Sequence, residues 1–250
     1  MLNVRNVSLA YGDNTILEAI DLTVEAGKFA SLIGPSGSGK TSILRAVTEL
    51  MAPRQGTIEL DAPLTDVGFL FQDDALLPWR TARQNVALGL RIRGEAQAAA
   101  NETAETWLGR LGLEGFGDRY PRQLSGGQRK RVAIAQVLAL QPKLLLMDEP
   151  FASLDAIVRT RITQELLDWV ERERMTVLLV THDLEEAITL SDVVYVLSQG
   201  PRATVRARHE VAIPRPRRVL DIRENPIFAR LLKTLWSELS DSTSVQSVTA

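Results

Sequence analysis

The eight residues that begin at Gly34 match the pattern G-x-x-x-x-G-K-[ST] at every fixed position, with lysine at Lys40 and threonine at Thr41. Glycines in such a loop let backbone N–H groups turn toward an anion, because no Cβ stands in the way. The lysine supplies positive charge to the β- and γ-phosphates of a nucleotide, and the threonine hydroxyl can ligate Mg²⁺. We therefore interpret the segment as a phosphate-binding loop rather than a flexible turn, with these binding residues: Gly34, Ser36, Gly37, Ser38, Gly39, Lys40, Thr41 and Ser42.

Two adjacent carboxylates end the apolar run Leu144–Met147 and supply groups for catalysis. Asp148 is placed to hold the Mg²⁺ shell, and Glu149 to polarise an attacking water as general base. General-base catalysis contributes about 10²–10⁴-fold to a rate. An acidic pair after a strand, taken alone, is more typical of a solvated turn. Together with a phosphate loop in the same chain, the pair favours a catalytic role.

A second glycine-rich stretch, Leu124–Gln128, precedes apolar residues at helical spacing. Ser125 is a suitable N-cap, and Gly126 and Gly127 permit a ligand to approach the backbone closely. A helix N-terminus of this kind binds anions. With Gln128 completing the stretch, the sequence predicts a second phosphate-binding surface on the same chain.

Strands and helices alternate along the chain in a way that positions these residues. Residues 20–24 alternate between apolar and polar, as in a half-buried strand, and the apolar run 29–33 leads into the phosphate loop. From 84 to about 113 the sequence is rich in Ala, Glu, Arg and Leu, which predicts a helical lobe inserted into a mixed sheet. Buried strands at 144–147 and 176–181 complete a predicted parallel sheet with helices on its faces.

Length and composition narrow the class of protein. The 250 residues suit one large domain or one domain with an inserted lobe, and a net charge of −2 does not indicate nucleic acid as a partner. The absence of cysteine excludes disulfides, thiol catalysis and Cys-based zinc sites, and two histidines exclude a histidine-rich metal site. No apolar run approaches the ~18–20 residues that cross a bilayer, and we expect no secretory leader.

The order of the three motifs resembles that of the ATP-binding subunits of ABC transporters, in which Leu124–Gln128 corresponds to the signature sequence. The resemblance covers roughly Leu2 to Val211. It implies an α/β fold of the P-loop NTPase class, as in ABC ATPases. Such a fold has a RecA-like parallel-sheet core, an antiparallel β subdomain and an inserted helical subdomain.

The same resemblance implies a division of the chain. We expect the ABC ATPase domain over residues 1–215, with the helical subdomain at about 74–140, and a C-terminal extension over 216–250. The last ten residues, Asp241–Ala250, lack a bulky anchor and are expected to be disordered.

By resemblance, four residues outside the three motifs gain roles. Tyr11 would stack on adenine, and Gln72 would sense Mg²⁺ and the γ-phosphate. Asp155 would communicate between subunits, and His182 would contact the γ-phosphate. The residues alone leave open a packed turn residue at Tyr11, a polar strand end at Gln72 and a structural histidine. Asp183, with a glutamate three residues later, resembles a capping box and supports the placement of the histidine at a strand-to-helix junction.

In the family, two copies meet head to tail, and the signature helix of one closes over ATP held by the other. The expected partners are a second copy of the chain, transmembrane permease subunits and, indirectly, a substrate-binding protein, with no nucleic acid. The chain would be peripheral, at the cytoplasmic face of the inner membrane. The expected cofactors are ATP and Mg²⁺, with the metal held by Thr41, Gln72 and Asp148 and hydrolysis assisted by Glu149, His182 and Gln72.

The stretch Phe71–Trp79 resembles the corresponding part of the nitrate, sulfonate and taurine importer ATPases, as do residues 148–151 and 197–201. Trp79 with Leu76–Leu77 either lines a groove for a coupling helix of the permease or packs within the helical lobe. Taurine or another small sulfonate is the first substrate expected, followed by nitrate, bicarbonate or a pyrimidine precursor. A non-transport ABC ATPase is a further alternative.

Some features depart from that subgroup and leave the substrate open. The segment 59–67 is shorter than usual, and Gln136 and Ala152 stand where Arg and Gly are common. The three arginines of 215–218 are interpreted as a solvated linker, with contact to lipid head groups or a partner as the alternative. Apolar spacing over 228–235 predicts a helix docked on the core.

Overall fold

The computed structural model describes residues 1–152 and 154–244, and the chain divides into two units. The first, called here the discontinuous unit, comprises residues 1–64 and the described residues from 164 onward. The second, the inserted unit, comprises residues 65–163. The predicted helical subdomain at 74–140 lies within the inserted unit.

Parallel strands form the centre of the discontinuous unit. β3 (Phe29–Ile33) lies between β7 (Thr176–Val180) and β8 (Val193–Leu197), and all three run parallel. β9 (Val205–Glu210) pairs antiparallel with β8. Every residue of the three parallel strands is buried, as expected for a sheet covered on both faces. The predicted strands at 29–33 and 176–181 are therefore confirmed.

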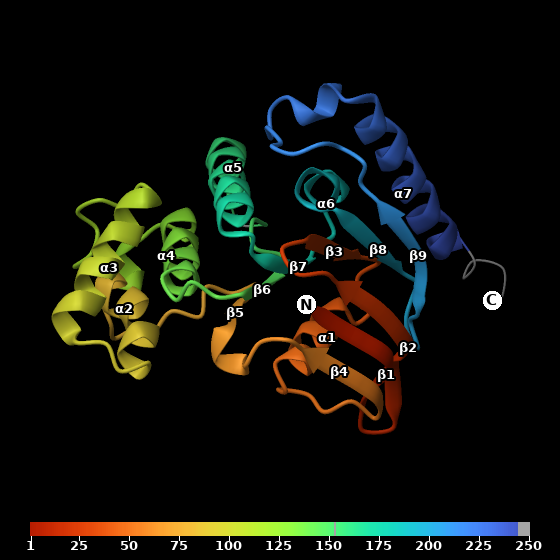
Figure 1. Cartoon of the computed structure of the whole chain (residues 1–250), viewed down its shortest axis with the longest axis horizontal. Helices are drawn as coiled ribbons and strands as arrows, with labels where there is room; N and C mark the ends of the chain where they lie inside the picture. The colour runs from red at the N-terminus through yellow and green to blue at the C-terminus, as the bar shows by residue number, and fades with distance from the viewer. Residues whose placement is uncertain (153, 245–250) are drawn as a thin grey trace. The chain divides into compact units, whose positions relative to one another are not determined.

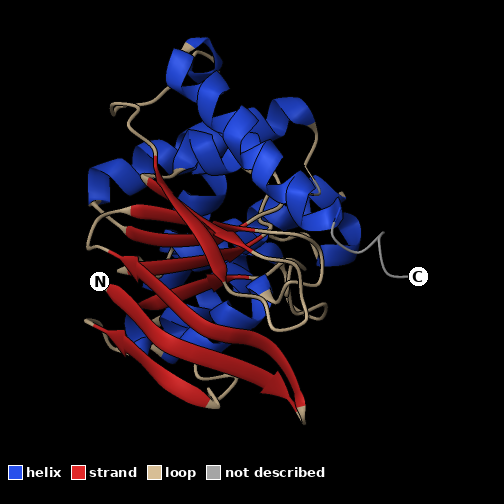
Figure 2. Cartoon of the chain, turned by 90° about the vertical axis from the view of Figure 1, so that its right-hand side faces the viewer, coloured by secondary structure: helices blue, strands red, loops and turns tan. Residues whose placement is uncertain are grey.

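An antiparallel sheet at the start of the chain completes the strands of this unit. Its order is β2-β1-β4, with β1 at Leu2–Tyr11, β2 at Asn14–Val24 and β4 at Gln55–Leu60. Figure 2 shows these strands as long twisted arrows beside the N-terminus. Residues 20–24 alternate between buried and exposed, as predicted for a half-buried strand. The antiparallel β subdomain is confirmed.

Helices of the discontinuous unit pack on its sheet. α1 (Lys40–Val47) follows β3, and α6 (Leu184–Leu190) lies between β7 and β8 in the chain. α7 (Pro226–Ser244), which follows the short 3-10 helix η3 (Ile222–Glu224), runs beside α6 and β9 in Figure 1.

The apolar face of α7 joins a buried cluster with α6 and the strands. Its members include Phe228, Leu231 and Leu235 of α7 and Ala187 and Ile188 of α6. The predicted docking of this helix on the core is confirmed. α7 includes residues 241–244, which were expected to be disordered, and residues 245–250 lie outside the described residues.

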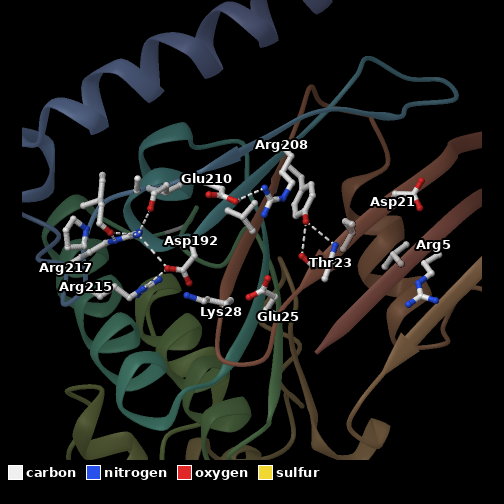
Figure 3. Close-up of a pocket in the computed structure, with 18 residues that line it drawn as sticks. Arg5, Asp21, Thr23, Glu25, Lys28, Asp192, Arg208, Glu210, Arg215 and Arg217 are labelled. Atoms are coloured by element: carbon white, nitrogen blue, oxygen red, sulfur yellow. Dashed lines mark hydrogen bonds and ion pairs between the residues drawn. The ribbon is translucent and has the colours of Figure 1, made fainter.

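The arginine-rich segment before η3 is built into the structure, which contradicts its interpretation as a solvated linker. The side chain of Arg217 is 1% exposed and donates to backbone carbonyls, among them Ser191 at 2.7 Å. Arg215 binds Glu171 at 2.8 Å and Asp192 at 2.9 Å, as the dashed lines of Figure 3 show for Asp192. Of the three arginines, only Arg218 is exposed. The sequence reading failed because buried carbonyls, which are the main acceptors here, leave no mark in a sequence.

The inserted unit combines two parallel strands with a group of helices. β5 (Val67–Leu70) pairs with β6 (Leu144–Asp148). α2 (Ala82–Ile92), α3 (Gln97–Arg110) and α4 (Gly126–Leu138) pack on one another, as Figure 1 shows.

Short connections complete the inserted unit. The 3-10 helices η1 (Leu64–Asp66) and η2 (Pro121–Gln123) precede β5 and α4. α5 (Ala156–Glu173) carries the chain from the inserted unit back to the discontinuous unit.

Candidate active site

The phosphate-loop residues join β3 to α1 in a form that requires glycine. Gly37 and Gly39 have φ angles of 78° and 88°, in the left-handed region that L side chains rarely adopt. A Cβ on Gly39 would lie 2.6 Å from Cγ2 of Ile16. Gly39 is also the N-cap of α1 and offers no side-chain acceptor, so no capping side chain satisfies the first N–H groups of this helix. The loop therefore presents helix N–H donors of the kind that bind phosphate.

Lys40 lies across its own loop. Its Nζ donates to the backbone oxygens of Gly34 at 2.8 Å and Pro35 at 2.9 Å. The lysine charge is therefore held directly at the loop, next to the N–H donors. Ser36 and Gly37 are exposed, whereas Ser38 is fully buried and uses its N–H to bond Pro35, so Ser38 shapes the loop. Thr41 is half-buried and Ser42 is buried.

The loop between β8 and β9 packs against the phosphate loop, a contact that the resemblance of residues 197–201 to importer ATPases did not reveal. A Cβ on Gly200 would lie 3.0 Å from the carbonyl oxygen of Gly37. Arg202 in the same loop pairs with Glu18 of β2, and Ala203 continues the contact through backbone hydrogen bonds to that strand. A glycine is therefore needed at Gly200 because two backbones approach each other there.

Tyr11 and His182 belong to the same unit as the phosphate loop. Tyr11 ends β1, is 51% exposed and accepts a hydrogen bond from Arg45 at 3.1 Å. A hydrogen bond with Ser42 lowers the pKa of the Tyr11 phenol, and Arg45 acts in the same direction. The ring remains available for stacking. His182 is exposed after β7, which is parallel to β3, so it leaves the sheet at the same edge as the phosphate loop.

The Asp183 half of the predicted capping box beside His182 is present. Asp183 accepts a hydrogen bond from the backbone N–H of Glu186 at 3.1 Å and caps the N-terminus of α6. The backbone N–H of Asp183 in turn donates to the hydroxyl of Thr181 at 3.0 Å. The histidine thus sits in a strand-to-helix turn that is fixed by hydrogen bonds on its C-terminal side.

Gln72, Asp148 and Glu149 belong to the inserted unit. Asp148 ends β6 and is 4% exposed. Leu70 at the end of β5 pairs with Met147 of the parallel strand β6, so the chain leaves toward Gln72 at the same edge as the carboxylates. Glu149 is half-buried and has a φ angle of 44°. Such a backbone costs a non-glycine residue about 1–3 kcal/mol and recurs at functional sites.

The signature residues form the predicted helix start. The Ser125 hydroxyl accepts from the N–H of Gln128 at 3.3 Å, and the Gln128 side chain accepts from the N–H of Ser125 at 2.9 Å. This capping box begins α4. Ser125 and Gly126 are exposed and Gly127 is half-buried, so the helix start is accessible from solvent.

Asp155 begins the next helix of the inserted unit in a similar way. Its carboxylate accepts from the N–H of Val158 at 3.0 Å, which is an N-cap bond for α5. Ile157, in the first turn, is 84% exposed. Sequence reasoning did not single out this exposed apolar side chain. The signal that could have identified it was an isoleucine two residues after Asp155, the predicted inter-subunit residue.

Two cations at the start of α4 also escaped sequence reasoning. Lys130 is 1% exposed, and its Nζ donates to the carbonyls of Phe71 and Gln72. Burial lowers the pKa of Lys130, whereas the carboxylates of Asp74, Asp73 and Asp148 act in the opposite direction. Arg129, its neighbour, pairs with Asp74 at 3.3 Å. One sequence signal could have predicted that Lys130 is buried: it lies four residues before Ile134 and therefore on the apolar face of the helix.

The loop before α2 presents a tryptophan to solvent. Trp79 is 71% exposed, so the alternative that it packs within the helical lobe is wrong. The fully buried Asn85 shapes this loop, because its side chain binds the N–H of Leu77 at 2.7 Å and the carbonyl of Arg80 at 3.1 Å. Leu76 and Leu77 are half-buried.

A cleft of the discontinuous unit has a different character. It measures about 830 Å³ and lies by Lys28 and Asp192, which precede β3 and β8, so it opens at the sheet edge opposite the phosphate loop (Figure 3). Several of its charges pair with each other, such as Arg208 with Glu210 and Arg215 with Asp192. Ligands of parallel sheets bind at the carboxyl ends of strands, so this cleft is not the active-site candidate.

Within the described residues, none of the helices is both long and apolar enough to cross a membrane. Among the same residues, no three His, Cys, Asp or Glu side chains cluster as a metal site.

Comparisons with known proteins agree on one family. A family profile described as "ABC transporter" matches residues 17–152, more than half of the chain. A solved dimer of the ATP-binding cassette MJ0796 in a post-hydrolysis state, bound to ADP and Pi, matches with a TM-score of 0.78 at 32% identity. That match covers 86% of this chain and 100% of the other.

Three curated relatives are import ATP-binding proteins. A sulfate/thiosulfate protein of Synechocystis sp. is 44% identical over 83% of this chain, and a nitrate protein of the same organism is 42% identical over 81%. An aliphatic sulfonates protein of Nocardia farcinica is 44% identical over 87%. The matched region spans 61%, 78% and 87% of these relatives, so it is less than two thirds of the first.

Proposed function

The chain belongs to the ABC transporter family, and from this membership we propose that it is the ATP-binding subunit of an importer for a small oxyanion, with taurine or another small sulfonate as the first substrate class. The subunit is an ATPase. The observation that carries the proposal is the phosphate loop, in which glycine-only turns, uncapped helix N–H groups and Lys40 converge on one anion site.

In the proposed cycle, ATP binds first to the discontinuous unit. The loop N–H groups and Lys40 bind the phosphates, and each charge-assisted hydrogen bond contributes about 1.5–3 kcal/mol. For the lysine to reach a phosphate, its Nζ exchanges the carbonyls of Gly34 and Pro35 for phosphate oxygens. Tyr11 stacks on adenine through its exposed ring, and His182 contacts the γ-phosphate from the end of the neighbouring strand.

We assign the metal site to Thr41, Gln72 and Asp148. Their hydroxyl, amide and carboxylate oxygens are the ligand types that Mg²⁺ prefers, and Asp148 is a nearly buried carboxylate at a strand end. Mg²⁺ held there would neutralise charge that develops on the phosphates. Glu149 acts as general base toward the attacking water, and its left-handed backbone sets the direction in which its side chain leaves the strand end.

The second copy of the chain is the proposed partner at the signature residues. Ser125 and Gly126 are exposed at a helix N-terminus, where backbone N–H groups can bind a phosphate. In a head-to-tail dimer, each helix start closes over the nucleotide of the other copy, which is a self-complementary interface. Asp155 and the exposed Ile157 belong to the same proposed interface. ATP therefore favours the dimer, and hydrolysis weakens it.

Permease subunits are the proposed partners of an apolar groove on the inserted unit. The groove measures about 250 Å³ and lies between β5, α2 and α4. Phe71 and Ile92 line it and are 42% and 77% exposed, so a substantial apolar surface is open to a partner helix. Trp79 is outside the lining residues but adds a second exposed aromatic side chain. Docking here would place the chain at the cytoplasmic face of the membrane as a peripheral subunit.

The test is reconstitution with the permease subunits that copurify with the chain, and a substrate-binding protein, in liposomes. The rate of ATP hydrolysis is compared between alternative transport substrates: taurine, a longer alkanesulfonate, sulfate, nitrate, bicarbonate and a pyrimidine precursor. Stimulation by sulfonates alone supports the proposal, and stimulation by another anion alone reassigns the substrate. Stimulation by the pyrimidine precursor alone would refute an importer of small oxyanions. Protein with Glu149→Gln gives the background rate of ATP hydrolysis. If no anion stimulates hydrolysis by the wild-type protein, an importer of small oxyanions is refuted.

A further inference from the structure

The backbone around Gln72 is attached to α4 by a buried lysine. The Nζ of Lys130 lies 2.8 Å from the carbonyl oxygen of Phe71 and 2.9 Å from that of Gln72, and it donates to both. Because the side chain is 1% exposed, water does not replace these bonds easily. Two consecutive carbonyls are thus fixed on one ammonium group, which restricts the peptide plane between them.

A second attachment joins the residue before Lys130 to the residue two positions after Gln72. Arg129 donates through Nε to the carboxylate of Asp74 at 3.3 Å and through Nη1 to the carbonyl of Leu124 at 2.9 Å. Leu124 immediately precedes Ser125, the N-cap of α4. The same arginine therefore connects the segment after Gln72 with the start of the signature helix.

The side chain of Gln72 is exposed and, within the described residues, makes no hydrogen bond. Its backbone is fixed while its amide is available for a ligand. This combination is unlike that of a structural glutamine, whose amide would be the group that is bonded. It is the arrangement expected of a sensor side chain on a positioned backbone.

We propose that Lys130 is a positioning residue that holds the Gln72 segment on the signature helix, so that Gln72 and Ser125 keep a fixed relative geometry through the ATPase cycle. The functional part of this inference rests on the proposed ATPase role of Gln72. Since Gln72 is assigned to the nucleotide of its own subunit and Ser125 to that of the partner, the attachment connects the two composite sites mechanically.

A purely stabilising role is the competing explanation. Replacing Lys130 by an apolar residue of similar length leaves the two carbonyls without their donor, so some loss of stability is expected under either explanation. The two explanations differ in kinetics. A misplacement of about 1 Å lowers a rate about 100-fold, so loss of positioning lowers kcat, whereas loss of stability alone lowers the amount of active protein.

The experiment compares Lys130→Met with wild type, using Lys143→Met as the matched control. Lys143 is also in the inserted unit but is 72% exposed and pairs only with Asp66 in the described structure. Steady-state ATP hydrolysis gives kcat and KM, fluorescent-nucleotide titration gives the Kd, and hydrogen–deuterium exchange reports on the peptide that contains Phe71–Asp74. All assays use protein shown to be folded by far-UV circular dichroism.

For Lys130→Met we expect kcat to fall about 10- to 100-fold, with the nucleotide Kd within about threefold of wild type. Exchange at Phe71–Asp74 should rise, while Lys143→Met behaves as wild type. Lys130→Arg, which restores donors for the two carbonyls, should recover part of the lost kcat. Asp74→Asn removes the second attachment and should raise exchange with a smaller fall in kcat; it also serves as the test if Lys130→Met does not fold.

Wild-type kcat in folded Lys130→Met would overturn the inference, as would unchanged exchange at Phe71–Asp74 in both Lys130→Met and Asp74→Asn. A wild-type chain without ATPase activity refutes the proposed function instead. In that case the exchange data still decide whether Lys130 holds the segment.

Discussion

Arg217 joins the C-terminal extension to α6, and its replacement by methionine tests how the discontinuous unit is held together. Its guanidinium is 1% exposed and donates six hydrogen bonds to five backbone carbonyls. Three of these carbonyls, those of Ile188, Thr189 and Ser191, lie at the C-terminal end of α6. Carbonyls there have no partner within the helix, and a cation is also favoured at that end of the helix dipole.

Methionine keeps most of the side-chain volume of Arg217 but removes every donor. A buried polar group that loses its partner costs about 1–3 kcal/mol, and removing one member of a buried charged network costs about 3–5 kcal/mol in total. We use the second range, because some of the five carbonyls can re-pair or admit water. A loss of about 3–5 kcal/mol is a large fraction of a typical stability of about 5–15 kcal/mol. It corresponds to a fall in Tm of roughly 6–20 °C for a chain of this size.

The expected loss for Arg217→Met does not depend on pH near neutrality. Burial lowers the pKa of Arg217 to about 10; the charge of Arg215 acts in the same direction, and Asp192 and Glu171 oppose it. Between this pKa and the higher pKa of arginine in the unfolded chain, the unfolded chain binds more protons than the folded one, so this group adds stability as pH rises only within that window. At about pH 6–9 the guanidinium is protonated in both states, and the difference between variant and wild type should be constant.

The measurement is urea unfolding followed by tryptophan fluorescence and far-UV circular dichroism, with Arg218→Met as the control. Arg218 is the next residue and is 82% exposed, so its substitution should change stability by less than about 0.5 kcal/mol. Arg217→Lys should be intermediate, since a single ammonium cannot reproduce the planar fork of donors. An Arg217→Met protein within about 0.5 kcal/mol of the Arg218→Met control would show that the carbonyl contacts are not a source of stability.

Other predictions concern nucleotide, catalysis and partner. Lys40→Ala should raise the Kd for ATP at least about tenfold, because one charge-assisted contact to phosphate is lost, and a direct titration with Lys28→Ala as control decides this. Glu149→Gln should lower kcat about 10²–10⁴-fold while ATP-dependent dimers persist in size-exclusion chromatography; a wild-type rate contradicts its role as general base. Trp79→Ser should reduce copurification of permease subunits, whereas Trp236→Ser, which alters an exposed tryptophan of α7, should not; equal recovery with both argues against docking through Trp79.

Sequence reasoning succeeded where a structure is determined by neighbouring residues. The cap of α4 by Ser125 and the cap of α6 by Asp183 each join residues three positions apart, and the positive φ angles of the phosphate-loop glycines are properties of single residues. Their geometry follows from local backbone chemistry, so spacing alone predicts them. The apolar runs of β3 and β7 were equally readable, because strands buried on both faces leave a continuous pattern.

It failed where a charged side chain finds its partners far along the chain. Lys130 binds carbonyls 58 and 59 residues away, and Arg217 binds carbonyls of residues up to 29 positions earlier. Every residue has a carbonyl, so such acceptors have no sequence signature, and a cluster of arginines looks like a solvated surface. Only the position of Lys130 on the apolar face of its helix gave a hint, and a cation on that face needs buried acceptors.

The setting of His182 shows why the C-terminal extension matters to the site. α6, which starts two residues after this histidine, has only seven residues, and an isolated helix shorter than about 12–15 residues is marginal in water. Its stability must therefore come from its surroundings. Asp183 caps its first turn, Arg217 binds the carbonyls at its end, and α7 covers its apolar face in a cluster that also includes Ile33, directly before the phosphate loop. The arginine and α7 both follow β9, so residues beyond the last strand of the sheet hold the helix that positions the histidine.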